Sequence, residues 1–324
     1  MKRFHNILFV KSDGNDDIAF ANAVAFANHN HASLTVVKTI DEIGEPIYGV
    51  PEETIRELEA AIFTNHRDTL EALAKPHRHT IKIRIKILEG IPFLSIIQEV
   101  MQNGFDLIIK SAVRNKGPVS RFFSTIDMQL LRNSPCPVWL LKPEQPEFIN
   151  RIVAAVDFDK PGGEGKNQGL NKQILEIAIL LASREGAELH IVHAWQAMSE
   201  NVLGSARSGL SEQMVDDYIA VVRKNHKRLL SQLMESAMGW VGKDVFDSVN
   251  LKTHVIEGQA QSVVIDLTRK LGSGLLVMGT VGRTGIPGFF IGNTAETILN
   301  NIDCSVLAVK PVGFISPVKP RKRT

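Results

Sequence analysis

The sequence predicts an α/β protein with two tandem units, each containing a mostly parallel five-stranded sheet flanked by helices. Three observations lead to this prediction. Short apolar runs alternate with longer segments of helical character along the chain, which is the pattern of parallel strands joined by crossover helices. The second half repeats the first at a constant offset, and a glycine-rich loop joins a strand to a helix near the C-terminus.

The first unit starts with an apolar run, Ile7 to Val10, that has the length of a buried strand. Residues 51–73 begin with proline and two glutamates, which favour the first turn of a helix. In residues 80–88, isoleucines alternate with basic residues, and this predicts an edge strand with one face in solvent. The predicted strands are residues 7–10, 33–38, 80–88, 107–109 and 138–141, and the predicted helices are residues 18–28, 51–73, 92–102 and 124–132.

The pattern then begins again after a short polar linker. Glu89 matches Glu257 and Cys136 matches Cys304, at an offset of 168 residues in each case (257 − 89 and 304 − 136). A constant offset over a long stretch indicates tandem duplication. The two cysteines therefore occupy equivalent places in separate units, which predicts two core thiols rather than a disulfide.

Near the start of each unit the offset is smaller. Val10 corresponds to Val156 at an offset of 146 residues (156 − 10), so we infer that the second half has gained residues after its first strand. We predict a first domain at residues 1–145, a second domain at residues 146–312 and a basic tail at residues 313–324.

The composition is that of an ordinary globular protein, with 44% hydrophobic and 22% charged residues. A net charge of +2 gives no reason to expect nucleic-acid binding, and the basic residues 319–323 are interpreted as a frayed solubilising tail. No stretch approaches the ~20 apolar residues of a membrane span, and the first apolar run is too short for a signal peptide. We therefore expect a cytoplasmic protein.

The most specific stretch is residues 275–311, which predicts a strand, a glycine-rich loop, a helix and a strand without a gap. Asn293 or Thr294 is placed to cap the helix, and Glu296 lies in its first turn. Glycines after a parallel strand let backbone amides approach an anion, and a helix N-terminus adds unpaired N–H groups. The stretch therefore predicts a phosphate cradle, against the alternative that the glycines only serve a tight crossover loop.

The glycine spacing separates this loop from commoner phosphate loops, because neither G-x-G-x-x-G nor G-x-x-x-x-G-K-[ST] is present. The sequence reads Gly279-x2-Gly282-x9-Gly292-Asn293. It resembles the nucleotide loop of the universal stress protein family, G-x2-G-x9-G-[ST], with Asn293 replacing the hydroxyl residue and Thr294 directly after it. The resemblance implies a Rossmann-like fold with ATP or a related nucleotide, and Mg²⁺ as its companion, in the second unit. Arg283 in the same loop is a further candidate contact.

The resemblance also implies a reader of the adenine edge. The matching positions are Asp157, after the first strand of the second unit, and a backbone group of Val192 on the next strand. From the residues alone, Asp157 is equally suited to cap the segment that follows it. A degenerate first loop, together with Cys-Pro-Val-Trp at residues 136–139, resembles the tandem E-type members of Gram-negative bacteria. That likeness implies a cytoplasmic stress-survival role without a settled reaction, and pairing of such domains within the chain or in a homodimer.

Opposite the three motif glycines, the first unit carries Ser111, Arg114 and Ser124. Side chains at these positions crowd the approach of a triphosphate to the backbone. We therefore expect the second unit to hold the nucleotide, while the first supplies fold, pairing surface or a site for another ligand.

Two other interpretations keep the fold and change the ligand. Residues 285–291 are strongly apolar for an exposed loop, and with Met198, Val202 and Leu203 they suit a cover over an amphipathic ligand whose anionic head meets the glycines. Loop packing or a protein interface explains the same residues, and a scaffold without a ligand is the third interpretation. An enzyme would need a general base near the phosphates, and Asp157 is the only candidate at that edge.

Overall fold

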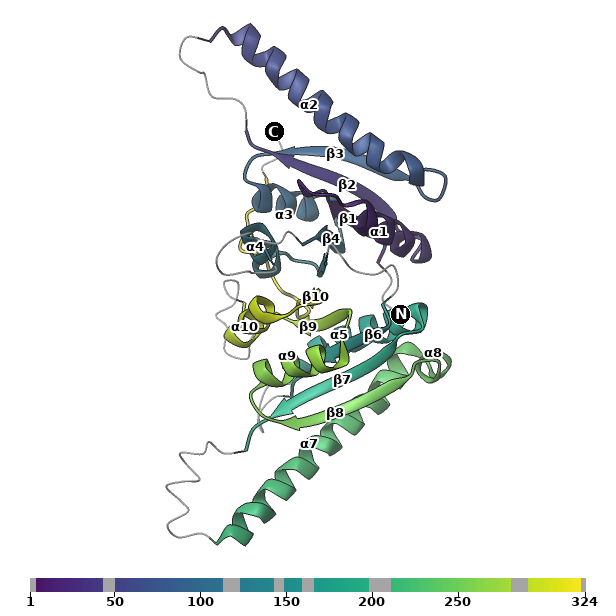
Figure 1. Cartoon of the computed structure of the whole chain (residues 1–324), viewed down its shortest axis with the longest axis vertical. Coiled ribbons are helices and arrows are strands. Elements are labelled where there is room, and N and C mark those ends of the chain that lie inside the picture. Colours follow the sequence, from purple (N-terminus) through teal and green to yellow (C-terminus); the bar gives the residue numbers. More distant parts are fainter. Residues whose placement is uncertain are drawn as a thin grey trace. The chain divides into compact units, whose positions relative to one another are not determined.

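A computed structural model of the chain describes residues 4–42, 50–112, 123–142, 149–158, 166–197, 211–280 and 291–321. Its contacts divide the described residues into two compact units. The N-terminal unit comprises described residues in the ranges 4–142 and 305–321 together with Ile291, and the C-terminal unit comprises those in 149–280 and 292–304 (Figure 1). The predicted domain boundaries at residues 145 and 312 remain predictions.

The N-terminal unit has strands in the order β3-β2-β1-β4-β5-β10. The first five are parallel, whereas β10 pairs with β5 in the antiparallel direction. The prediction of a mostly parallel sheet flanked by helices is confirmed. The predicted five strands per unit are not found, because the strand expected at the end of the second unit is β10, which belongs to the N-terminal unit and pairs with β5. The elements are β1 (Asn6–Val10), α1 (Asp17–His29), β2 (Ser33–Ile40), α2 (Glu52–Ala74), the short 3-10 helix η1 (Lys75–His77), β3 (Ile83–Glu89), α3 (Pro92–Asn103), β4 (Leu107–Ser111), α4 (Thr125–Asn133), β5 (Val138–Leu141) and β10 (Ser305–Val309).

The C-terminal unit has the parallel strand order β9-β6-β7-β8. Its long helix α7 lies along β8, as α2 lies along β3 in the N-terminal unit (Figure 1). The elements are β6 (Arg151–Ala155), α5 (Lys166–Glu185), β7 (Glu188–Trp195), α7 (Glu212–Val241), α8 (Lys243–Asp247), β8 (Leu251–Glu257), α9 (Ala260–Leu271), β9 (Leu275–Gly279) and α10 (Asn293–Asn301).

The apolar runs become central strands because helices cover both faces of such sheets. Residues Ile7 to Val10 and Leu275 to Met278 are all buried, at no more than 4% exposure. β3 lies at the end of the strand order, and its isoleucines alternate with exposed basic residues, so the predicted edge strand is confirmed.

Strand register corrects the comparison of the two halves. Ile7 pairs with Leu107 in one unit, and Ile152 pairs with Leu275 in the other. Leu107 and Leu275 are 168 residues apart (275 − 107), so Ile7 corresponds to Ile152 at an offset of 145 (152 − 7).

The predicted pairing of Val10 with Val156 is therefore wrong by one residue, and Ser12 is the counterpart of Asp157. The reason is physical. A strand that is buried on both faces has no polar alternation to fix its register, so only its partner strand defines it.

The two cysteines, Cys136 and Cys304, are buried and neither forms a disulfide, as predicted. Burial raises the pKa of the Cys136 thiol to about 12, which makes that sulfur an inert part of the core. None of the helices in the described residues has the length and apolar character needed to cross a membrane.

The described part of the C-terminal tail is anchored rather than frayed. Gln98 and Gln102 on α3 donate hydrogen bonds to the main-chain oxygens of Lys319 and Arg321, at 3.2 and 3.3 Å. The tail is held through its backbone, so its amino-acid composition gave no signal of this contact.

Candidate functional site

The candidate site of the C-terminal unit lies at the carboxyl ends of β6 and β9, two neighbouring parallel strands. The strand order reverses there, since β7 and β8 lie on the other side of β6. Such a switch point leaves a crevice in which ligands of α/β sheets bind. Asp157 follows β6 and Gly279 ends β9, so the fold brings these two predicted site residues to the same edge.

Asn171 of α5 clamps the backbone of Asp157. Its amide oxygen accepts from the Asp157 N–H at 3.2 Å, and its amide nitrogen donates to the Asp157 carbonyl at 2.7 Å. The Asp157 carboxylate accepts from the N–H of Phe158 at 3.0 Å. The backbone of Asp157 is therefore fixed at this edge of the sheet, and both of its predicted roles stay predictions.

Sequence reasoning missed Asn171. Its side chain is 3% exposed, and an isolated polar residue within the first turns of a helix carries no motif. Its neighbours in the sequence include Lys172 and Gln173, so nothing in the local pattern marks it as buried or connects it to a residue 14 positions away.

Val192, the other predicted base contact, is 1% exposed on β7, and its carbonyl accepts from the N–H of Val156 at 3.0 Å. The next residue, His193, reaches α7: its Nε2 lies 2.9 Å from Nδ1 of His226. Phe158 packs edge-on against His193, with ring centroids 4.6 Å apart. A histidine pair thus borders the same edge, and it too escaped sequence analysis because the partners are 33 residues apart.

Gly279 has a packing role as well as a place in the motif. A Cβ at this position would lie 2.6 Å from Cδ2 of Leu170 on α5, so the absent side chain allows close helix–strand contact. This observation supports the alternative role of the glycine as a folding feature, and it is compatible with a ligand on the open side.

A backbone hydrogen bond joins the residue after β9 to the residue before α10. The N–H of Gly292 donates to the carbonyl of Thr280 at 2.9 Å. Thr280 is fully buried, and its hydroxyl oxygen has no hydrogen-bond partner within the described residues. A buried hydroxyl without a partner is costly, which makes this atom a marker of a missing polar partner.

The predicted cap of α10 by Asn293 or Thr294 is wrong. The N-cap is Gly292, which has no side chain, and no side-chain hydrogen bond caps the helix. Asn293 and Thr294 are instead the first two helical residues, and both are exposed. Among the described residues no side chain caps α10, and an uncapped helix N-terminus is suited to bind an anion.

Several predicted residues lie outside the described part of the chain. These are Gly282 and Arg283 of the glycine motif, residues 285–290 of the apolar loop, and Met198, Val202 and Leu203 of the predicted cover. Their roles stay predictions.

The N-terminal unit fills the equivalent helix N-terminus with its own side chains. Ser124 is the N-cap of α4, and its hydroxyl accepts from the N–H of Asp127 at 3.2 Å. The Asp127 carboxylate accepts in return from the N–H of Ser124 at 2.8 Å. Asp127 also pairs with Lys110 of β4, 2.7 Å from its Nζ, and both side chains are at most 5% exposed. In this unit the Asp127 carboxylate thus takes the place of an external anion, and the buried Lys110 ammonium is its partner.

Each unit contains a mainly parallel sheet with the strand order of a doubly wound α/β fold. Many proteins with such a fold bind nucleotides. The model of the universal stress protein family matches residues 3–142 and again residues 149–310. The chain belongs to the universal stress protein family, in a tandem form.

Curated relatives narrow the likeness to the tandem E-type proteins. Universal stress protein E of Escherichia coli K12 is 32% identical over 242 residues, which cover 74% of this chain and 72% of the relative. The homologue of Haemophilus influenzae is 26% identical over 318 residues, covering 95% of this chain and 98% of the relative.

Solved structures agree on the fold. A structure from Pseudomonas aeruginosa UCBPP-PA14 has a TM-score of 0.66 at 24% identity, and the match covers 95% of this chain and 94% of that one. A universal stress protein from Archaeoglobus fulgidus DSM 4304 has a TM-score of 0.58 at 15% identity, with 94% and 98% coverage.

Proposed function

We propose that this chain acts in a cytoplasmic stress response as a binding module whose C-terminal unit takes ATP or a related nucleotide. The observation that carries the proposal is the start of α10, where the first turn has no side-chain cap and the neighbouring Thr280 hydroxyl is buried without a partner among the described residues. Phosphate oxygens would accept from the helix amides and from this hydroxyl.

In this proposal the phosphate contacts come from the end of β9 and the start of α10, and the base contacts come from the ends of β6 and β7. On the phosphate side, Gly279, Gly282 and Gly292 admit the backbone amides, with Arg283, Asn293 and Thr294 as side-chain contacts. On the base side, Asp157 and a backbone group of Val192 read the adenine edge, with Asn171 holding Asp157 in place. A Mg²⁺ ion would arrive with the phosphates, because nucleotide sites bind it chiefly through phosphate oxygens and water.

The amphipathic ligand and the ligand-free scaffold remain the alternatives. The apolar cover on which the first depends lies mostly outside the described residues, so no structural observation favours it. The buried Thr280 hydroxyl argues for a polar ligand group at the glycines, which a scaffold without a ligand leaves unexplained.

Isothermal titration of the purified, nucleotide-stripped chain with ATP and GTP tests the proposal. We expect one ATP per chain, loss of binding in Gly282→Glu, and a larger loss for ATP than for GTP in Asp157→Ala. The matched controls are Arg114→Glu and Ser12→Ala, which change the equivalent positions of the N-terminal unit and should leave ATP affinity unchanged.

Two results would overturn it. If a folded Gly282→Glu variant binds ATP like the parent, the phosphate cradle is wrong. If Asp157→Ala weakens ATP and GTP equally, Asp157 does not read the base. Phosphate release measured on the same samples decides whether any turnover accompanies binding.

A further inference from the structure

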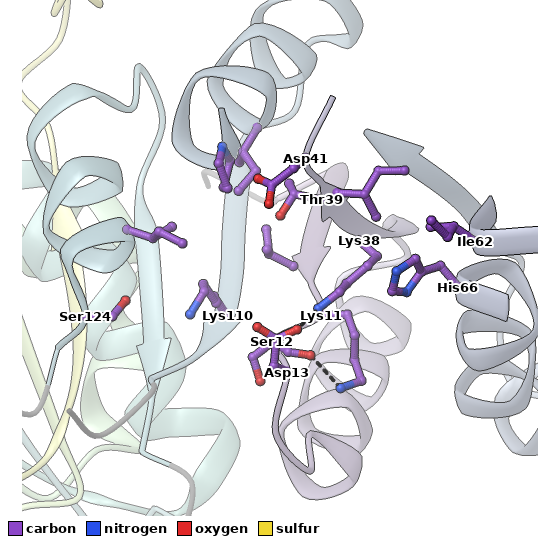
Figure 2. Close-up of a pocket in the computed structure, with 15 residues that line it drawn as sticks. Lys11, Ser12, Asp13, Lys38, Thr39, Asp41, Ile62, His66, Lys110 and Ser124 are labelled. Atoms are coloured by element: carbon purple, nitrogen blue, oxygen red, sulfur yellow. Dashed lines mark hydrogen bonds and ion pairs between the residues drawn. The ribbon is translucent and has the colours of Figure 1, made fainter. Parts of the chain in front are cut away.

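The N-terminal unit contains a cavity of about 540 Å³ at the carboxyl ends of β1, β2 and β4 (Figure 2). Its volume lies within the ~300–1,000 Å³ typical of small-molecule sites. One part of the wall is aliphatic and comes from strand ends and from α2, α3 and α4: Val10, Ile40, Ile62, Pro92, Ile96 and Ile126. The other part is charged and comes mainly from strand ends: Lys11, Asp13, Lys38, Asp41 and Lys110.

The end of this cavity that corresponds to a phosphate site is closed. Lys110 pairs with the Asp127 carboxylate and donates to the carbonyl of Ser111 at 3.0 Å. Asp127 in turn accepts from the N–H of Ser124 at the start of α4. The helix N-terminus and the buried ammonium group therefore already have their anion, and a polyphosphate would have to displace a buried carboxylate.

Lys11 is also occupied by its own chain. Its Nζ donates to the main-chain oxygens of Ser12 and Gly14, both at 2.7 Å, and lies 3.4 Å from the buried carboxylate of Asp16. These partners form a closed turn after β1, so Lys11 is held there by its own loop.

Lys38 differs because its partner is exchangeable. The Lys38 side chain extends from β2 to Asp13, next to Ser12 (Figure 2). The ammonium-bearing side chain is 13% exposed, whereas the Asp13 side chain is 98% exposed. Because the Asp13 side chain is exposed, its carboxylate is hydrated when it leaves this contact, and an anionic ligand in the cavity can take its place as the partner of the Lys38 ammonium.

We propose that this cavity is a second ligand site, selective for a compact organic monoanion, a carboxylate or sulfonate with an apolar body. The acid group pairs with Lys38 as Asp13 swings into solvent, and the body packs on the aliphatic wall. Nucleotides are excluded because Asp127 occupies the anion position at α4. The site is separate from the proposed nucleotide site, so either proposal can fail alone.

The test uses the full chain with ATP present to saturate the C-terminal unit. The probe is 8-anilinonaphthalene-1-sulfonate, an apolar monoanion whose fluorescence reports binding, with octanoate as competitor. We expect saturable binding of one probe per chain that octanoate displaces and further ATP does not. Asp13→Asn removes the competing carboxylate from an exposed position and should tighten probe binding about two- to fivefold.

Lys38→Met should weaken probe binding at least about tenfold, because a hydrogen-bonded charge on the ligand loses its partner. Lys38→Arg should retain most of the affinity. Lys82→Met, which removes an exposed lysine of the same unit, is the control and should change nothing. The proposal is overturned if Asp13→Asn leaves the probe affinity unaltered, if Lys38→Met and Lys82→Met behave alike, or if added ATP displaces the probe.

Discussion

The ion pair between Lys110 and Asp127 gives the sharpest test of how the N-terminal unit is built. Both side chains are at most 5% exposed, and their charged atoms are 2.7 Å apart. Removal of one partner of a buried pair costs about 3–5 kcal/mol, because the other charge stays buried alone. Replacement of both partners by apolar residues is close to neutral.

The two single substitutions should differ. In Asp127→Ala the Lys110 ammonium keeps, within the described residues, the carbonyl of Ser111, and α4 loses its capping box, which adds about 1 kcal/mol. In Lys110→Met the Asp127 carboxylate still accepts from the N–H of Ser124 at the positive end of α4. We therefore expect Asp127→Ala to reduce the free energy of unfolding by about 4–6 kcal/mol and Lys110→Met to reduce it by less.

The double variant has a natural template. The counterparts of Lys110 and Asp127 in the C-terminal unit are Met278 and Ala295, 168 residues later, and both are buried. Lys110→Met with Asp127→Ala should recover all but about 1–2 kcal/mol, the loss of the cap and some packing.

Urea unfolding alone does not define one free energy for a chain of two units. Hydrogen exchange of peptides from β4 and α4, followed by mass spectrometry, measures the opening free energy of the N-terminal unit directly. If the cost of the double variant equals the sum of the two single costs, the side chains are not coupled and the reasoning fails.

Three further predictions concern single contacts. Burial lowers the pKa of Lys310 to about 7 from its ordinary 10.5, so the unfolded chain binds more protons between these values and stability should rise with pH across that window. Hydrogen exchange of peptides from the N-terminal unit at pH 7 and 9 should show this rise in the parent chain but not in Lys310→Met, and an equal rise in both would contradict the prediction. Gly279→Ala should cost about 1–2 kcal/mol of stability because its Cβ meets Leu170, and Leu170→Ala in the same chain should relieve part of that cost. Asn171→Ala should weaken ATP binding, because Asn171 positions the Asp157 backbone. In chains that already carry Asp157→Ala, adding Asn171→Ala should leave GTP binding unchanged, and calorimetry of the double variant checks this.

Much of the architecture follows from the sequence, because a short apolar run between turn residues in an α/β chain is most often a parallel strand buried on both faces. The pairing of a strand cannot be predicted from its sequence where only the neighbouring strand determines its direction. The strand Ser305–Val309 is buried throughout, and nothing in such a run distinguishes a parallel from an antiparallel neighbour, so its pairing with β5 was not predicted. The same lack of polar alternation explains the one-residue error at Val156.

The candidate site was predictable only in part for a related reason. Glycines and an aspartate after a strand have a recognisable spacing, and the fold brings Asp157 and Gly279 to one edge. Asn171 and the pair of His193 with His226 depend on contacts between elements that are distant in the chain, which no local pattern encodes. The cap of α10 was misplaced because Gly292 carries no side chain by which to recognise an N-cap.

The contrast between α4 and α10 leads to a prediction about how ligands stabilise the protein. Both helices follow the fourth parallel strand of a repeat, and both need negative charge or acceptors at their first turn. In α4 the Asp127 side chain completes a capping box, whereas among the described residues no side-chain hydrogen bond caps α10, whose first turn carries Glu296. The stability of the C-terminal unit should therefore depend on its ligand, by about 2.7 kcal/mol at a hundredfold excess over Kd.

Hydrogen exchange with and without ATP separates the two units in one experiment. Peptides of β9 and α10 should gain protection of that order, while peptides of β4 and α4 should be unaffected. The Asp127→Ala and Lys110→Met double variant adds a stringent control, since it removes the capping carboxylate of α4, and α10 has Ala295 at the equivalent position. If ATP protects neither unit in a chain that binds it, the helix N-terminus does not contact the phosphates, and the anion site must lie elsewhere on the C-terminal unit.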